Sequence, residues 1–485
     1  MKPIMPLAAV LLATGCSLAP PPVRTPLPVP PSWPAGDAYL RQTEATLPSV
    51  SYPDVFRDPR LQQIIVQALA NNRDLAIAAA NIAAARAQYR VQRAGIFPQV
   101  DAGAGYVRSQ TASSGTGTGG GFARSGDNFS ADIGISGFEI DFFGRLRSLT
   151  QAQRNRWLAT EAAARAVRLN LVADLAQAWL AHAADRSLLD VARQTVASAR
   201  RSVDLTAARL EGGIAARTDL AQARQILAQA EADVAAQTTA VAQDVNALQL
   251  LAGSEIDPAL LPSAIASAGD SIAPLPAGLS STILLRRPDI VEAEFQLRAA
   301  NAEIGAARAA LFPTISLTGI VGLASDALSS LFTSNAFTWR AGPAANYPIF
   351  RAGAGRAGVD LSTARRDAAL AGYQRAIQTG FRDVADALAR QGTIDAQRAA
   401  ISRQAEAAAD TFALTDARYR GGIDPFLASL DAQRALYTAQ RSLVNTQFIA
   451  AANRVALYRA LGGDTRIGNG AAGPAPQRAA GGPQP

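Results

Sequence analysis

Cysteine, histidine, lysine and aromatic residues are all scarce in this sequence. It holds one Cys (Cys16) and one His (His182), and Lys2 is its only lysine. A single Cys excludes an internal disulfide, and His182 has no Cys or carboxylate cluster at metal-ligand spacing, so we expect it on a helix surface or in a helix seam. Aromatic residues make up only 6% of the chain while apolar residues make up 49%. Much of that apolar share is Ala, which favours close helix–helix packing over a thick core.

Signals for nucleotide binding, nucleic-acid binding and hydrolysis are also weak. The formal net charge is +7, but the arginines are scattered among acids on helices, which indicates solvated faces rather than a nucleic-acid footprint. The segment Gly115–Gly120 matches G-x-G-x-x-G, but it lies in a polar loop with no helix after it. No G-x-S-x-G motif is present, so no motif supports the hypothesis of a hydrolase lipoprotein. We predict a protein that is not an enzyme and has no cofactor.

Long hydrophobic runs are absent, and the longest candidate lies at the N-terminus. Lys2 is followed by an apolar stretch over residues 7–14, which is too short to span a bilayer and reads as a signal peptide over residues 1–15. Cys16 follows, and the segment resembles a bacterial lipobox, with Ala13 where that motif usually has Leu. The resemblance implies cleavage before Cys16 and a covalent lipid on that residue, and Ser17 after it favours the outer membrane. An ordinary signal peptide with an incidental Cys is the alternative.

Proline and glycine are missing from a long internal stretch, Arg145 to Glu211. A helix of that length would reach roughly 100 Å, so one compact core cannot bury it. Its second half carries a heptad seam with alternating spacings of three and four, formed by Leu189, Ala192, Val196, Ala199, Val203, Thr206 and Leu210. A second seam follows the glycines Gly212 and Gly213, running from Leu220 to Val241. Two seams joined by a glycine turn predict a long antiparallel helical hairpin.

The whole arrangement then occurs a second time. Another helix without proline runs to Arg420, breaks at Gly421 and Gly422, and returns from Asp424-Pro425, where we expect Asp424 to be the N-cap. Each copy also begins with a shorter helix, the first one running from Asp58 to about Ile96. The two short helices of each copy together are about as long as the long helix, as the wall of a cylinder requires.

The repeat defines the expected domains. These are a signal peptide at 1–15, an extended lipid-anchored segment at 16–57, repeat 1 at 58–252, an equatorial linker at 253–283, repeat 2 at 284–461 and a disordered tail at 462–485. In repeat 1 we expect strands at about 99–107 and 129–140, a long helix at 144–211 and a return helix at 217–251. In repeat 2 we expect strands at about 314–322 and 337–350, a long helix at 353–420 and a return helix at 425–461.

The strands alternate apolar and polar residues, as a sheet with one lipid face and one wet face does. Four strands cannot close a barrel, and unpaired edges in lipid cost several kcal/mol for each bare backbone group. Three chains would give twelve strands, the smallest multiple that leaves an open bore. The predicted fold is therefore mostly α with a trimeric twelve-stranded β-barrel continuous with a long α-helical, coiled-coil tunnel.

At this point the chain resembles the outer-membrane efflux proteins, specifically the lipid-anchored outer-membrane factors of tripartite resistance–nodulation–division pumps. The matching segments are residues 29–34, 58–61, 71–75, 139–145, 285–290, 312–313, 348–350 and 383–388. The resemblance implies a homotrimer in the bacterial outer membrane with its tunnel in the periplasm. It also implies a periplasmic adaptor (a membrane fusion protein) and an inner-membrane resistance–nodulation–division pump as partners, and drugs or other small molecules as cargo.

The gate is expected at the inner tip, formed by Gly212, Gly213, Gly421 and Gly422. Leu427 and Asp431 are four residues apart on one helix face, so in a trimer they would form a leucine ring and a carboxylate ring. The resemblance assigns Asp431 to the closed constriction, and Tyr419 to a latch between helices. Asp424 stands where that latch has an arginine. The alternative is that Asp431 is a solvated position paired with Arg434.

Two rival functions follow from the same features. A lipid-anchored periplasmic adaptor would carry one helical hairpin between β-rich halves, whereas this chain carries two hairpins and amphipathic strands. An outer-membrane channel for type I secretion or for metal efflux would have the same architecture with another cargo. The sequence favours a channel, and it leaves its cargo open.

Overall fold

The structure is a computed structural model that describes residues 18–21, 28–30, 32–34, 36, 38–39, 51–111, 124–275 and 281–463. The predicted signal peptide, Cys16, most of the extended segment, the Gly115–Gly120 loop and nearly all of the predicted tail lie outside the described residues. The described chain is mostly helical with four strands, which agrees with the predicted fold class.

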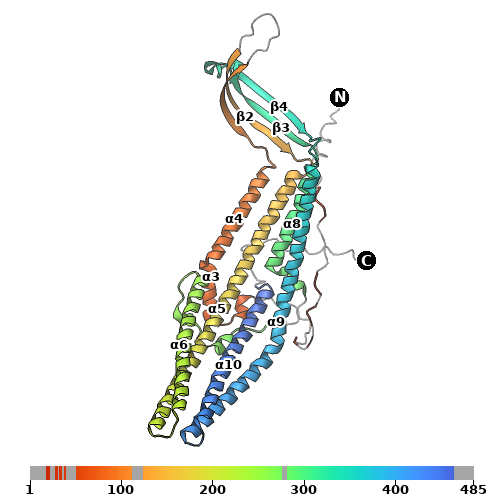
Figure 1. The fold of residues 1–485 in the computed structure, drawn as a ribbon. Helices are drawn as coiled ribbons and strands as arrows, with labels where there is room; N and C mark the ends of the chain where they lie inside the picture. The colour runs from red at the N-terminus through yellow and green to blue at the C-terminus, as the bar shows by residue number, and fades with distance from the viewer. Residues whose placement is uncertain are drawn as a thin grey trace, which may run out of the picture. The chain divides into compact units, whose positions relative to one another are not determined.

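The elements follow one another in two similar sets (Figure 1). The first set is α2 (Tyr52–Val55), α3 (Pro59–Asn71), α4 (Arg73–Ala94), β1 (Asp101–Thr111), β2 (Arg124–Ile140), α5 (Arg145–Glu211) and α6 (Arg217–Ala252). The connection holds η1 (Pro258–Leu260), α7 (Ile265–Asp270) and η2 (Ser281–Arg286). The second set is α8 (Pro288–Ala309), β3 (Thr314–Ser325), η3 (Leu328–Ser330), η4 (Ser334–Ala336), β4 (Phe337–Asn346), α9 (Ala354–Arg420) and α10 (Phe426–Ala460).

Contacts divide the chain into two compact units that do not coincide with the two repeats. The first unit comprises residues 1–25, 81–160 and 293–373, and the second comprises 26–80, 161–292 and 374–485. Each repeat contributes to both, because the long helices α5 and α9 run from one unit into the other. The first unit contains the sheet, and the second contains the two glycine turns.

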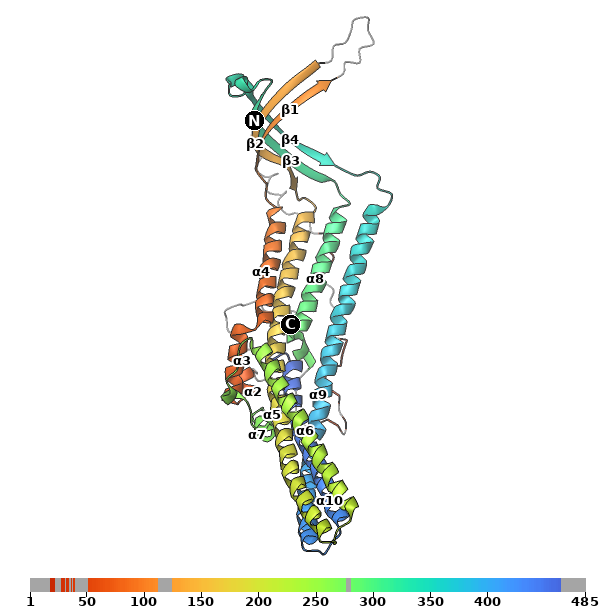
Figure 2. The same cartoon turned by 60° about the vertical axis from the view of Figure 1, so that its left-hand side comes forward.

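The sheet of the first unit is antiparallel throughout, in the order β1-β2-β3-β4 (Figure 2). Its register brings Ile133, Val321 and Trp339 into one cross-strand row, and Ala131, Leu323 and Phe337 into the next row on the same face. The row between them holds Asp132, Gly322 and Thr338, whose side chains belong to the opposite face because successive residues of a strand alternate. One face of the sheet is therefore apolar across three strands.

The first short helix is not continuous. We expected one helix from Asp58 to about Ile96, but α3 ends at Asn71 and α4 begins at Arg73. The extended Asn72 separates them, and its side-chain oxygen accepts hydrogen bonds from the backbone amides of Asp74 (2.9 Å) and Leu75 (3.1 Å). Asn72 therefore acts as a helix cap, a role that short polar side chains fill well. The single-helix prediction was wrong because this local cap competes with helix continuation.

Two described parts of the N-terminal segment are fastened to helices. In the first unit, Arg308 and Asn301 of α8 donate hydrogen bonds to the carbonyl oxygens of Leu18 (3.3 Å) and Pro20 (2.8 Å). In the second unit, the indole of Trp33 is buried and stacks on Phe381 of α9, with 4.9 Å between ring centroids. The segment expected to be a plain tether thus has fixed contacts.

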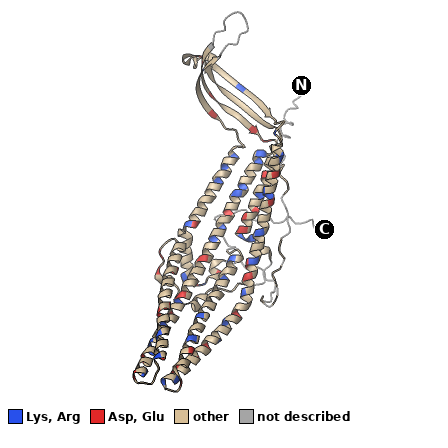
Figure 3. Cartoon of the chain, viewed as in Figure 1, with Lys and Arg blue, Asp and Glu red and all other residues tan. Residues whose placement is uncertain are grey.

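Charged residues of both signs are interspersed along the helices, and few lie on the strands (Figure 3). This matches the expectation that the arginines share helix faces with acids. Among the helices that the structure describes, none combines the length and the apolar character needed to cross a membrane.

Two glycines with nearly the same backbone conformation allow the packing at the end of α6 to be tested. Gly253 and Gly213 have φ of +72° and +74°. A Cβ on Gly253 would lie 2.5 Å from the carbonyl oxygen of Asn71, whereas a Cβ on Gly213 meets nothing within 4 Å. Gly213→Ala should lower the free energy of unfolding by about 1 kcal/mol through the left-handed φ alone. Gly253→Ala adds an overpacking cost of about 1–3 kcal/mol. Thermal loss of helical circular dichroism in detergent checks this, and equal shifts for the two variants would contradict the close approach.

Candidate functional site at the helical tips

The two hairpins end in turns with the same backbone geometry. At the end of α5, Gly213 is left-handed and the amide of Ile214 donates to the carbonyl of Arg209 at 2.8 Å. At the end of α9, Gly422 has the same φ of +74° and the amide of Ile423 donates to the carbonyl of Arg418 at 2.9 Å. Both are Schellman turns, which require a residue with positive φ just past the helix end. They leave Ile214 and Ile423 exposed.

Asp424 has a different role from the one its position suggested. The N-cap of α10 is Pro425, and no side chain caps that helix. Instead the guanidinium of Arg418 donates to both carboxylate oxygens of Asp424, at 2.6 and 2.9 Å. This bidentate bond to Arg418 lowers the pKa of the Asp424 carboxyl. The N-cap prediction was wrong because an arginine six residues earlier offers a charged partner, which binds a carboxylate more strongly than a backbone amide does.

Tyr419 joins the two hairpins of the chain. Its ring is buried in a cluster with Ala223, Phe426 and Leu430, so the cluster draws on α6, α9 and α10. Its hydroxyl lies 3.0 Å from the hydroxyl of the fully buried Thr206 on α5. Breaking this contact leaves a buried polar group without its partner, which typically costs about 1–3 kcal/mol.

Arg209 of α5 reinforces the same junction. Its guanidinium donates to the carbonyl oxygens of Tyr419 (2.9 Å) and Arg420 (3.1 Å), which lie in the last turn of α9. The guanidinium carbon also lies 4.4 Å from the centroid of the Tyr419 ring. Arg209 therefore satisfies carbonyls that a helix end leaves free and places a positive charge at the negative end of the helix dipole.

Sequence reasoning found Tyr419 but not its partners. The one available signal for Thr206 was that it is the polar member of the heptad seam of α5. Arg209 lies outside that seam, and nothing in the sequence distinguishes it from the other arginines of the helix. Both partners lie more than 200 residues from Tyr419 along the chain, as separations of 213 and 210 residues show.

Leu427 and Asp431 lie on the face of α10 that turns away from the cluster. Leu427 is 55% exposed and the side chain of Asp431 is 64% exposed, whereas Phe426 and Leu430 are buried. Arg434 approaches Asp431 only loosely, at 4.0 Å, and both side chains are at least half exposed. Such a pair contributes little to stability. Within one chain, Leu427 and Asp431 thus share an exposed stripe.

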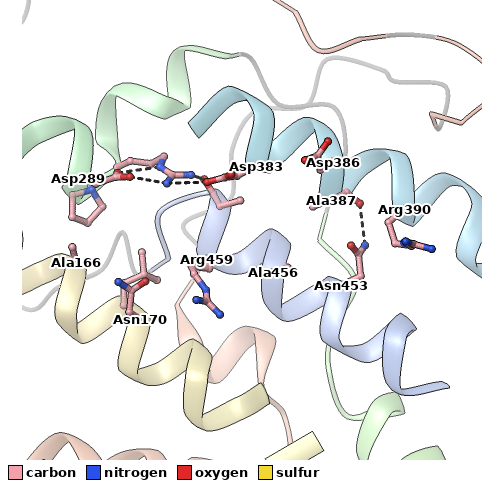
Figure 4. Close-up of a pocket in the computed structure, with 14 residues that line it drawn as sticks. Ala166, Asn170, Asp289, Asp383, Asp386, Ala387, Arg390, Asn453, Ala456 and Arg459 are labelled. Carbon is pink, nitrogen blue, oxygen red and sulfur yellow. Dashed lines mark hydrogen bonds and ion pairs between the residues drawn. The ribbon is translucent and has the colours of Figure 1, made fainter. Parts of the chain in front are cut away.

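One cavity in the described part of the chain lies away from the tips, where α10 ends and α8 begins. It has a volume of about 460 Å³ and lies between α5, α9 and α10 (Figure 4). The guanidinium of Arg287 crosses one side of it, donating to the carbonyl of Ala460 (2.8 Å) and to both carboxylate oxygens of Asp289 (3.1 and 2.7 Å). Asp383 lies 3.6 Å from the same guanidinium. These charges hold a helix junction together.

The first repeat closes the equivalent junction with a neutral side chain. Asn72 occupies the position of Arg287, two residues before an acid in the first turn of the next helix. Its amide donates to the carbonyl of Leu251 at 2.9 Å, near the end of α6. An amide and a guanidinium thus perform the same task in the two repeats.

Comparison with known proteins decides the family. Residues 64–254 and 279–463 match the family described as "Outer membrane efflux protein". The chain belongs to this family. It is 41% identical over 453 residues to the toluene efflux pump outer membrane protein TtgC of Pseudomonas putida, covering 93% of each chain. It is 37% identical over 467 residues to the cation efflux system protein CusC of Escherichia coli, covering 95% of this chain and 99% of that one.

Solved structures agree with this assignment. The open-state MtrE outer membrane channel of Neisseria gonorrhoeae matches with a TM-score of 0.80 and 32% identity, over 93% of this chain and 98% of that one. The predicted family and the predicted fold class are confirmed. So is the predicted function at the level of the family: this outer membrane efflux protein is a channel component of an efflux system and not an enzyme.

The helical wall of this outer membrane efflux protein also holds a pair of acids. Burial, together with the neighbouring carboxylate of Asp185 on α5, raises the pKa of Asp244 on α6 to about 7. His182 lies one turn before Asp185 and is buried, which favours the seam over the helix surface of the two positions expected for it, and burial lowers its pKa. The described residues contain no group of three or more His, Cys, Asp or Glu side chains arranged to hold a metal ion.

The acid pair predicts a pH-dependent stability. The pKa of Asp244 is higher in the folded chain than its ordinary value of 3.8, so the folded state holds a proton that the unfolded state has lost between about pH 4 and pH 7. Stability should therefore fall as pH rises through that window. Asp244→Asn should remove this fall and raise the melting temperature at pH 8. Glu231→Gln is the control, because it removes an exposed carboxylate elsewhere on α6, and an unchanged pH profile in Asp244→Asn would contradict the raised pKa of Asp244.

Proposed function

We propose that this protein is the outer-membrane exit duct of a tripartite efflux system and works as a homotrimer. Three sheets would close into a twelve-stranded barrel, and the helices would line a tunnel through the periplasm. The observation that carries this proposal is the apolar sheet face, whose central row is Ile133, Val321 and Trp339. All three side chains are exposed in the single chain. A continuous exposed apolar face with polar residues behind it is what a lipid-facing strand set requires.

The sheet edges support association as well. β1 and β4 are the two ends of the strand order, and each pairs with only one neighbour among the described strands. In a hydrocarbon environment such bare edges cost several kcal/mol for each unsatisfied group. Pairing of β4 in one copy with β1 in the next satisfies both edges. The test is direct: protein purified in detergent should have the mass of three chains and conduct ions in planar bilayers, and a non-conducting single chain would overturn the proposal.

The exposed hairpin tips indicate which partners the duct would bind. The exposed Ile214 and Ile423 lie in glycine turns at the tips of the hairpins, where a periplasmic adaptor would dock, and the adaptor would connect the duct to an inner-membrane pump of the resistance–nodulation–division type. Gly212, Gly213, Gly421 and Gly422 would form the inner tip. The Tyr419 junction with Thr206 and Arg209 would hold the tip closed within one chain, with Arg418–Asp424 stiffening the second turn.

The constriction would lie at Leu427 and Asp431. Their exposed stripe lies opposite the buried Phe426 and Leu430, so it faces the space that three copies would enclose if the apolar cluster lies in the wall. Three leucines would narrow the bore and three carboxylates would favour cations. The first repeat has Thr218 and Gln222 at the equivalent positions, so only the second repeat would supply charge.

Small organic compounds are the favoured cargo. The relatives include proteins named for toluene and for cations. Soft metal ions prefer thiolate and thioether ligands. The two methionines of this chain, Met1 and Met5, both lie in the expected signal peptide, and Cys16 is the expected lipid site. A mature chain would then have no free thiolate or thioether along its length, so the wall of the duct would offer no such ligand to a soft metal ion.

Asp431 should control ion selectivity. Asp431→Ala removes a ring of three charges from the constriction and should lower the cation-to-anion permeability ratio by a factor of about two or more. Reversal potentials in planar bilayers under a salt gradient measure this ratio. Asp410→Ala, which removes an exposed acid from α9, is the matched control and should leave the ratio unchanged. An unchanged ratio in Asp431→Ala would take this residue out of the pore lining.

Cys16 should carry the lipid. Leu18, two residues later, is bonded to Arg308 near the end of α8, and the chain after α8 leads into β3. Cys16→Ala should abolish labelling with radioactive palmitate while trimers persist. Ser17→Ala should keep the label, and continued labelling of Cys16→Ala would show that the anchor is elsewhere.

A further inference from the structure

A second contact joins the two hairpins farther from the tip. The hydroxyl of Tyr437 on α10 donates to a carboxylate oxygen of Asp233 on α6 at 2.6 Å. The other carboxylate oxygen accepts from the side-chain amide of Gln229, one turn earlier in α6, at 3.0 Å. Both acceptor atoms of Asp233 are thus used, and the carboxylate is held in one orientation toward α10.

Its position relative to the proposed constriction is informative. With a rise of 1.5 Å per residue, Tyr437 lies about 9 Å beyond Asp431 along α10, while Phe426 of the apolar cluster lies about 8 Å before Asp431. Leu427 and Asp431 therefore lie on a stretch of helix that is fastened to the first hairpin at both ends. The tip cluster holds one end, and Tyr437 holds the other.

The chemistry of this contact makes it a strong link between α10 and α6. A hydroxyl that donates to an ionised carboxylate forms a short, charge-assisted hydrogen bond, and the contact is partly buried. Burial, and then the bond to Asp233, raise the pKa of Tyr437 to about 12. The hydroxyl thus keeps its proton at every pH below about 10, and the bond loses its donor only as pH rises toward 12. The guanidinium of Arg441 lies 5.4 Å from the ring centroid and packs the ring from one side.

The contact occurs once in the chain, not twice. The repeat places Ala228 at the position equivalent to Tyr437, and Ser442 at the position equivalent to Asp233. Because Ala228 has no polar side-chain group, the equivalent bond cannot form in the other direction. The bond ties α10 to the first hairpin of its own chain and has no repeat counterpart.

We propose that Tyr437 and Asp233 are positioning residues of the gate. Their hydrogen bond, called the clasp below, fixes the point about which the second hairpin pivots. When the tip cluster opens, the clasp confines movement to the part of α10 between the tip and Tyr437. It therefore limits how far Leu427 and Asp431 can move away from the constriction. This inference rests on the proposed channel function. It differs from the Tyr419 junction, which decides whether the tip opens at all.

The experiment compares conductance in two backgrounds. Tyr437→Phe keeps the ring and its contact with Arg441 and removes only the hydroxyl. In purified trimers in planar bilayers, Tyr437→Phe should raise single-channel conductance at least twofold when added to Tyr419→Phe, and far less when added to the wild-type chain. Thr438→Val is the matched control, because Thr438 is exposed and bonds only to the carbonyl of Arg434 in its own helix.

A double-mutant cycle separates the clasp from a general loss of stability. In the Tyr419→Phe background, Asp233→Ala and Tyr437→Phe should each raise conductance, and their combination should raise it no further, because both remove one bond. The increase should also be the same at pH 6 and pH 8. Additive effects, or a conductance equal to that of Tyr419→Phe alone, would overturn the clasp. If instead neither the wild type nor Tyr419→Phe conducts, the proposed channel function itself fails.

Discussion

Two helices of 67 residues each impose the constraint on which this fold depends. Each would be about 100 Å long, and no compact core can cover such a length. Every other feature of the helical part serves to give these helices neighbours: return helices of 36 and 35 residues, shorter helices before the strands, and seams rich in Ala that allow close approach. The low content of aromatic residues follows from the same constraint, because wide side chains would hold neighbouring helices apart.

The two repeats show how one backbone plan can carry different chemistry. Both tips use the same Schellman turn, but only the second adds an ion pair, between Arg418 and Asp424. Both helix junctions bind the last carbonyls of a return helix, but one uses Asn72 and the other uses Arg287. Backbone requirements are therefore met in both halves, whereas the ion pairs at these two places occur only in the second half.

Much of this fold could be predicted because its signals are local and repeated. The long helices begin and end within one residue of the expected positions, since stretches without proline end in glycine pairs whose second member has a φ that only glycine adopts easily. The strands follow a two-residue alternation, although β2 begins five residues earlier than expected. The break at Asn72 was not predictable from these signals, because residues on both sides favour a helix and only the side-chain cap interrupts it.

The candidate site was less accessible from sequence. That Leu427 and Asp431 share one helix face followed from helical periodicity, which is a local property. The partners of Tyr419 and Tyr437 did not, because Thr206 and Asp233 lie 213 and 204 residues away and belong to a different hairpin. Asp424 shows the opposite failure: a local rule predicted an N-cap, and a nearby arginine outcompeted it. Contacts between hairpins depend on how the hairpins pack, which no single-helix pattern encodes.

The order of the strands has a consequence for how such a protein is made. Because β1 and β4 are different strands, joining one copy to the next is a head-to-tail contact. Each added copy pairs with one free strand edge and presents another. Only a closed ring leaves no strand edge unpaired, so every incomplete assembly can pair with another extended polypeptide. In the proposed ring, a chain whose neighbour has not yet arrived would therefore present an unpaired strand edge.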